Sequence, residues 1–160
     1  MMEEHRALAE RKAELVELRV DYMRKRPDMG VLLKNRPTPV IVTCRRRADR
    51  GRWFGTEEQR QAVLREAIIG GAEYVDLEDD IAKSVRRYGQ TKRIVSYHNF
   101  EETPLELYDI HRRMAQCDAD IIKIVTMANS PADNVRMLEM VSAAEIPTVG
   151  FCMGELGTIS

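Results

Sequence analysis

The sequence predicts an α/β protein of the TIM (β/α)8-barrel type, here reduced to about six βα units. Six short apolar runs rich in β-branched residues alternate with helical segments at regular spacing, as in the right-handed βαβ units of a parallel sheet. Polar side chains gather where these runs end, and a barrel has its active site at the carboxyl ends of its strands. No glycine-rich phosphate turn follows the first run, which disfavours a doubly wound nucleotide-binding sheet.

The first elements follow from the spacing of the apolar residues. Residues 3–13 are polar and helix-favouring, and 15–20 alternate charged with apolar residues as a strand does. A short helix over 28–35 leads to a second strand over 39–44, which is continuously apolar up to its last residues. A polar loop rich in arginine and glycine is then expected over 45–55.

The middle of the chain begins with a well-marked helix. Thr56 is a favoured N-cap, acidic residues fill the first turn, and the Gly70-Gly71 pair ends the helix at about residue 69. A third strand over 73–78 and a helix over 80–88 follow.

The last elements continue the alternation. A fourth strand is expected over 93–97 and a helix over 103–117, opened by a Thr-Pro-Leu-Glu sequence that has the form of a capping box. The fifth strand covers 120–125, Ser130 opens the next helix, and 146–151 form the sixth strand.

Composition excludes several classes of protein. The 160 residues are 44% hydrophobic with no proline- or glycine-rich linker, so we expect one domain over 1–160. A net charge of −1 gives no general attraction to nucleic acid or to an anionic membrane, and no segment has the length and apolarity of a membrane span or a signal peptide. Three cysteines without a CxxC pair disfavour disulfides and a metal site and indicate the cytoplasm.

Lys123 is the strongest catalytic candidate. It lies within Ile-Ile-Lys-Ile-Val, a run typical of a strand buried on both faces, where an ammonium ion is costly unless it is paired or deprotonated. Desolvation depresses the pKa of a lysine, and the neutral amine is the form that attacks a carbonyl to give a Schiff base. The alternative is a lysine whose amine reaches solvent from the strand end.

Acidic and basic side chains repeat with the period of a strand. A period of two places Glu17, Arg19 and Asp21 on one face of the first strand. These charges form either a network or a binding site inside the barrel, or they are the solvated side chains of an edge strand. Asp76 and Glu78 share a face of the third strand in the same way. A salt bridge to a nearby lysine or arginine and a catalytic role both stay open for this pair.

Two further candidates follow strands directly. Arg45 comes just after the second strand, where its fork of donors is suited to clamping a carboxylate. His98 follows the fourth strand and is either structural or a general acid–base partner of Lys123. His5 and His111 fall on predicted helices and are expected at the surface.

Six segments, taken in order, resemble the type I 3-dehydroquinate dehydratases, the Schiff-base enzymes of the shikimate pathway. They span nearly the whole chain, at residues 17–21, 42–45, 74–78, 96–100, 122–124 and 154–160. The resemblance implies a TIM barrel that dehydrates 3-dehydroquinate to 3-dehydroshikimate without a cofactor. By it, Lys123 forms an imine with the C3 ketone, and His98 removes the C2 proton and protonates the departing C1 hydroxyl.

The same resemblance implies roles for the residues around this pair. The residues expected to bind the substrate are Glu17, Arg19, Arg45 and Met153. Asp76 is expected to support the lysine. Asp49 stands where relatives carry an acid that orients the histidine, and its side chain is one methylene shorter than the glutamate of some members.

Against the same family, the first and last strands of the barrel are missing, so that the chain corresponds to strands two to seven of eight. An open parallel sheet has two edges with unpaired backbone groups. We therefore expect low stability, self-association such as a homodimer, and weak or no turnover. Two alternatives remain: a non-catalytic barrel fragment that self-associates, and another Schiff-base barrel such as a class I aldolase.

Overall fold

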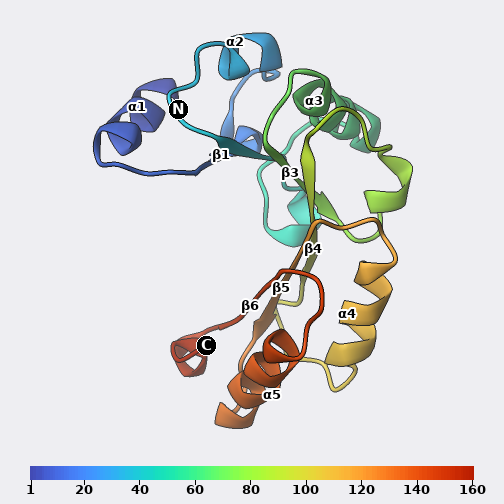
Figure 1. The fold of residues 1–160 in the computed structure, drawn as a ribbon. Coiled ribbons are helices and arrows are strands. Elements are labelled where there is room, and N and C mark those ends of the chain that lie inside the picture. Colours follow the sequence, from blue (N-terminus) through green and yellow to red (C-terminus); the bar gives the residue numbers. More distant parts are fainter. The chain divides into compact units, whose positions relative to one another are not determined.

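The computed structural model describes all of residues 1–160 and contains six strands, which lie in the sheet in the order of the chain (Figure 1). They are β1 (Val16–Arg19), β2 (Val40–Thr43), β3 (Tyr74–Glu78), β4 (Lys92–His98), β5 (Ile121–Met127) and β6 (Thr148–Met153). The pairs β1–β2, β2–β3, β4–β5 and β5–β6 are parallel. All six predicted strands are confirmed, with ends that differ by at most two residues.

The chain also contains five α-helices and four short 3-10 helices. The α-helices are α1 (Met2–Glu10), α2 (Met29–Leu33), α3 (Glu57–Ile69), α4 (Leu107–Ala115) and α5 (Pro131–Ser142). The 3-10 helices are η1 (Val20–Tyr22), η2 (Arg47–Asp49), η3 (Ala82–Ser84) and η4 (Glu155–Gly157). By its contacts the chain divides into two compact units, one of Met1–Asp76 with Val85–Lys92 and the other of Leu77–Ser84 with Arg93–Ser160.

The two best-marked helices begin where their capping residues predict. Thr56 and Gln59 form a reciprocal capping box at the start of α3, and Gly70 caps its other end. Gly71 follows with a φ of +75°, a left-handed conformation that glycine adopts without steric cost. Helix α5 has its own capping box, made by Ser130 and Asp133.

The helix predicted over 80–88 is wrong. Only the three-residue η3 forms there. The Ser84 hydroxyl donates a hydrogen bond to the Ile81 carbonyl at 2.8 Å, and the backbone N–H of Ser84 donates to the same oxygen at 2.8 Å. A serine side chain that bonds to nearby backbone in this way competes with the helical ladder, and the turn is not continued.

The helix predicted from Thr103 also starts later than expected. Helix α4 begins at Leu107, and its N-cap, Glu106, makes no side-chain cap. The Thr103 hydroxyl donates to the Met127 carbonyl at 2.9 Å and lies 2.8 Å from the Thr126 hydroxyl. The Thr103 hydroxyl is therefore directed toward β5, and no side chain caps the start of α4.

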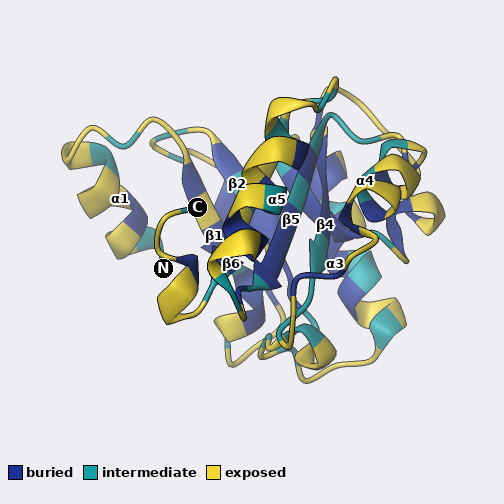
Figure 2. Ribbon diagram, turned by 90° about the horizontal axis from the view of Figure 1, so that it is seen from below, coloured by how far each residue is buried: buried dark blue, intermediate teal, exposed yellow.

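In the second unit, one face of the strands is covered by helices. Helices α4 and α5 pack against β5 and β6, and Figure 2 shows β5 largely buried while much of α5 is exposed. Gly150 of β6 lies so close to α5 that a Cβ there would be 2.5 Å from Val141 Cγ2 and 2.8 Å from Met137 Sδ. Ile124 of β5 is the register partner of Gly150 and has no exposed surface. The even-numbered residues of β5 and β6 therefore face the helices.

Two histidines differ from the surface positions expected for them. His5 of α1 is 1% exposed, and its Nε2 lies 2.8 Å from the Thr38 hydroxyl. His111 of α4 is half-buried, with its Nε2 2.9 Å from the Thr148 hydroxyl. Each histidine joins a helix to the segment just before or at the start of a strand, a partner that helical periodicity alone does not reveal.

Candidate active site

Lys123 and His98 lie on neighbouring strands of the second unit and on the same face. Ser96 of β4 is the register partner of Lys123 of β5, and His98 comes two residues after Ser96. Alternate residues of a strand share a face, so the two side chains project from the same side of the strand pair. Strand spacing and rise place their Cα atoms about 8 Å apart. An amine and an imidazole at this separation can reach adjacent atoms of one small molecule.

Lys123 is half-buried, so its side chain is neither enclosed on all sides nor fully in solvent. Its neighbours Ile122 and Ile124 have no exposed surface. The difference follows from alternation: the two isoleucines have the parity that faces the helices, and the lysine projects from the opposite face.

His98 and Met153 border the lysine at the carboxyl ends of their strands. The His98 ring stacks on Phe100, with centroids 5.9 Å apart and planes 19° from parallel, which restricts the orientation of the imidazole. Met153 is the last residue of β6, and its register partner on β5 is Met127. Met127 comes four residues after Lys123 on the same strand. Met153 therefore shares the face of the lysine, nearer the strand ends.

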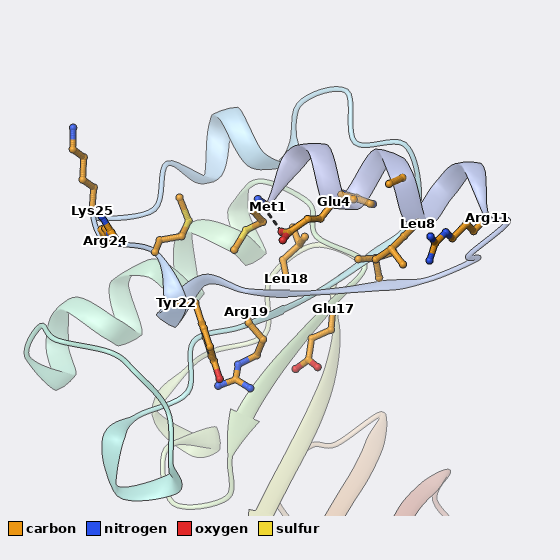
Figure 3. A pocket seen from close by; sticks show the side chains of 14 residues that line it. Met1, Glu4, Leu8, Arg11, Glu17, Leu18, Arg19, Tyr22, Arg24 and Lys25 are labelled. Carbon is orange, nitrogen blue, oxygen red and sulfur yellow. Dashed lines mark ion pairs between the residues drawn. The ribbon is translucent and has the colours of Figure 1, made fainter.

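In the first unit, Glu17 and Arg19 share a face of β1. Figure 3 shows both side chains pointing away from α1, whereas Leu18 between them points toward it. The Thr43 hydroxyl of β2 donates to Glu17 Oε1 at 2.7 Å. Sequence reasoning missed Thr43, although its position two residues before Arg45 gives it the same parity.

Asp21 holds Arg19 in place. Arg19 donates to both carboxylate oxygens through Nε and Nη2, each at 2.8 Å, and the backbone N–H of Arg52 donates to the same carboxylate at 3.0 Å. Burial alone raises the pKa of Asp21, but the hydrogen bonds from Arg19, Arg52 and the Arg45 backbone hold it below its usual value. Asp21 is thus a buried, ionised anchor for the end of β1.

Arg45 and Asp76 form a buried ion pair. Arg45 Nη2 lies 2.8 Å from Asp76 Oδ1, and the two side chains are 5% and 1% exposed. The salt bridge left open for Asp76 is therefore present, with Arg45 as its partner. Because this pair is removed from water, losing either member leaves an uncompensated buried charge.

Asp49 lies in the loop after β2, within η2. Its carboxylate accepts a hydrogen bond from Arg46 Nε at 2.5 Å, three residues earlier. Burial of this pair is partial, with side chains 29% and 15% exposed. The structure therefore places Asp49 against its own loop.

A cavity of about 1010 Å³ opens in the first unit between α1, β1 and the segment after η1 (Figure 3). Glu17 and Arg19 are part of its lining, while Met1, Leu8 and Leu18 supply apolar surface. Lys123 and His98 belong to the second unit and are not among its lining residues. No group of histidine, cysteine or acidic side chains is arranged to hold a metal ion, and no helix has both the length and the apolarity of a membrane span.

Comparison with known proteins gives one family. The model of the type I 3-dehydroquinase family matches the chain over residues 1–160. The chain is 38% identical over 160 residues to the 3-dehydroquinate dehydratase of Desulfotalea psychrophila, covering 92% of this chain and 70% of that protein. It is also 38% identical over 159 residues to the bifunctional 3-dehydroquinate dehydratase/shikimate dehydrogenase of Arabidopsis thaliana, of which it spans only 26%.

Solved structures give the same fold. The crystal structure of 3-dehydroquinate dehydratase from Geobacillus kaustophilus superposes with a TM-score of 0.85, over 99% of this chain and 70% of that one, at 24% identity. This likeness confirms the predicted fold class.

Proposed function

Because the chain belongs to the type I 3-dehydroquinase family, we propose that it carries the catalytic residues of a 3-dehydroquinate dehydratase that works through a Schiff base on Lys123. The observation that supports this most is the register of β4 and β5, which puts Lys123 and His98 on one face. We further propose that residues 1–160 act as one TIM-barrel domain, since strands and helices alternate throughout both units.

The chemistry needs an amine and one acid–base group. The neutral amine of Lys123 attacks the C3 carbonyl, and loss of water from the carbinolamine gives a protonated imine. The imine draws electrons from the neighbouring carbon, so that His98 can remove the C2 proton. As the C1–O bond breaks, His98 returns that proton to the departing hydroxyl, which leaves as water. Hydrolysis of the imine then releases 3-dehydroshikimate and regenerates the lysine. The imine itself is the electron sink, so the proposal includes no cofactor and no metal.

Substrate binding is assigned to residues of both units. Glu17 and Arg19 are placed against the hydroxyl groups and ring, and Arg45 and Met153 in the surrounding shell. Supporting roles fall to Asp76, whose carboxylate fixes Arg45, and to Asp49 in the loop after β2. The hydrogen bond from Thr43 to Glu17 and the bidentate pair of Arg19 with Asp21 support these assignments, because each fixes a side chain before substrate arrives.

We propose that the chain self-associates, for example as a homodimer. The outer strands β1 and β6 each pair with only one other strand, which favours such association.

We also propose that the enzyme is cytoplasmic, in keeping with three buried cysteines that form no disulfide.

The test is turnover of 3-dehydroquinate by the purified chain, with 3-dehydroshikimate as the measured product. Lys123→Met should abolish turnover, and His98→Asn should lower kcat by about 10²–10⁴-fold, the usual range for one acid–base group. Lys34→Met, which removes an exposed lysine on the loop after α2, is the matched control and should behave as the parent. A folded chain with no turnover would favour the non-catalytic fragment, and retro-aldol cleavage would favour an aldolase.

A further inference from the structure

The largest side chain without exposed surface belongs to an arginine outside the proposed site. Arg60 lies in the first turns of α3 and is 0% exposed. Its Nε and Nη2 donate to the two carboxylate oxygens of Glu57 at 2.8 and 2.7 Å, and its Nη1 donates to the Cys44 carbonyl at 2.6 Å. Burial raises the pKa of Glu57, but hydrogen bonds from Arg60 and Gln61 hold it below its usual value. A buried cation is tolerated when it is paired and bonded in this way.

The carbonyl that Arg60 binds belongs to the peptide group between Cys44 and Arg45. The N–H of that same peptide group, on Arg45, hydrogen-bonds to the Asp21 carboxylate. A carboxylate therefore holds one end of the peptide plane and a guanidinium holds the other. The peptide unit is planar and rigid. Holding both its carbonyl oxygen and its N–H therefore fixes the position of the Arg45 Cα, which lies in the same plane.

The other side of Arg45 is confined as well. A Cβ on Gly51 would lie 2.0 Å from the Arg45 carbonyl oxygen, so the loop after β2 packs directly onto that peptide group. From this held backbone the Arg45 side chain extends to Asp76. The direction of the guanidinium is thus set by backbone contacts on both sides of its Cα.

We propose that Arg60 is a positioning residue: by holding the Cys44 carbonyl, it directs the Arg45 guanidinium toward Asp76 and the substrate. The consequence for substrate binding rests on the proposed function, whereas the consequence for the geometry of Arg45 does not. A residue that only stabilises α3 would lower stability without moving Arg45, which gives the proposal a distinguishing readout.

The first experiment observes Arg45 directly by ¹⁵N NMR of arginine side chains, with its signal assigned from Arg45→Lys. In the parent protein, the Arg45 guanidinium signal should show the restricted rotation of a buried ion pair. Arg60→Lys, which keeps the charge but loses the fork of donors, should shift this signal and remove the restriction. An unchanged Arg45 signal in a folded Arg60 variant would overturn the proposal.

The matched control is another buried arginine that binds backbone carbonyls elsewhere. Arg93 is 4% exposed and donates to the carbonyls of Ala82 and Cys117. Arg93→Lys should lower the melting temperature as much as Arg60→Lys does, yet leave the Arg45 signal in place. If both variants alter Arg45 equally, its geometry depends on general stability and the proposal is wrong.

A second measurement needs only the parent protein, in case the Arg60 variants do not fold. The Arg45 amide, held by Asp21 on a peptide group that Arg60 also holds, should exchange with deuterium as slowly as the amides of β2 and β3. Fast exchange of this amide would show that the peptide group is not held, and would contradict the proposal.

Kinetics then tests the link to substrate. Arg60→Lys should raise KM for 3-dehydroquinate about tenfold while kcat changes by less than about twofold, as expected when uniform binding is lost. In an Arg45→Lys background the same substitution should add no further change in KM, because the two residues act in series. Absence of turnover in every variant, the parent included, counts against the proposed function, and the NMR result alone then decides the role of Arg60.

Discussion

Single side chains take their roles here from their parity along a strand. Ile122 and Ile124 of β5 face the helix layer, while Lys123 between them projects from the opposite face and stays half-buried. In β1, Leu18 points toward α1, and Glu17 and Arg19 point away from it (Figure 3). In β1 and β5, one face thus packs toward helices, and the other presents charged side chains where chemistry is proposed.

The buried pair of Arg45 and Asp76 gives a prediction on stability. Asp76→Asn leaves the Arg45 cation buried without its counter-charge, so the free energy of unfolding should fall by about 3–5 kcal/mol. Urea unfolding measures this loss. The exposed pair of Arg26 and Glu66 is the control, since Glu66→Gln should cost less than about 1 kcal/mol. Similar small losses for both substitutions would contradict the burial of the Arg45–Asp76 pair.

At the scale of elements, predictions succeed where helix ends depend on neighbours in sequence. Helices α3 and α5 begin at capping boxes closed within four residues, at Thr56 and Ser130. The prediction at Thr103 fails because its hydroxyl hydrogen-bonds to residues more than twenty positions away in the sequence. Distance along the chain, rather than strength of the local signal, separates the two outcomes.

The same distinction applies to the candidate site. Lys123 and His98 could be proposed from their strands and from a family resemblance. The bond from Arg60 to the Cys44 carbonyl joins residues sixteen positions apart, and that from Arg52 to Asp21 joins residues thirty-one apart. Periodicity reports on one element at a time, so contacts of this kind were not predictable from it.

Helix α1 is attached through a buried histidine, which predicts a pH dependence. Burial, together with the nearby charge of Arg36, lowers the pKa of His5. As pH falls below about 6.5, the unfolded chain binds a proton at this histidine that the folded chain does not, so stability is lost from there down to the folded pKa. Chemical unfolding between about pH 7 and pH 5 should therefore show a declining free energy of unfolding.

Substitution identifies the source of this slope. His5→Gln keeps a polar group for Thr38 and removes the titration, so the slope should become shallower. Burial also lowers the pKa of His111, so His111→Gln should remove a further part, and the double variant should be flattest. A parent protein whose stability does not change over this range would contradict the assigned burial of both histidines.

At the scale of the whole molecule, the two outer strands differ from the four inner ones. Strands β1 and β6 each pair on one side only. On β6, Val149 and Phe151 are 49% and 37% exposed, an apolar strand surface of the kind that pairs with other chains. Backbone pairing and apolar contact both favour association through this edge.

Sedimentation velocity should accordingly show a mass that rises with protein concentration. The double substitution Val149→Lys and Phe151→Lys places charge on β6 and should shift the equilibrium toward monomer. Val31→Lys, at a 64% exposed position on α2, is the control and should leave association unchanged. A monomer at every concentration, or association that survives the β6 charges, would rule out pairing through this edge.

The proposed function requires the amine of Lys123 to form a Schiff base with a carbonyl substrate. The measurement is intact mass after incubation with 3-dehydroquinate and borohydride, followed by peptide mapping, with a full-length relative treated in parallel. We predict one reduced adduct on the peptide that contains Lys123, and none in Lys123→Met. No adduct, or an adduct on another lysine, while the relative is labelled, would contradict the assignment of Lys123 as the nucleophile of this chain.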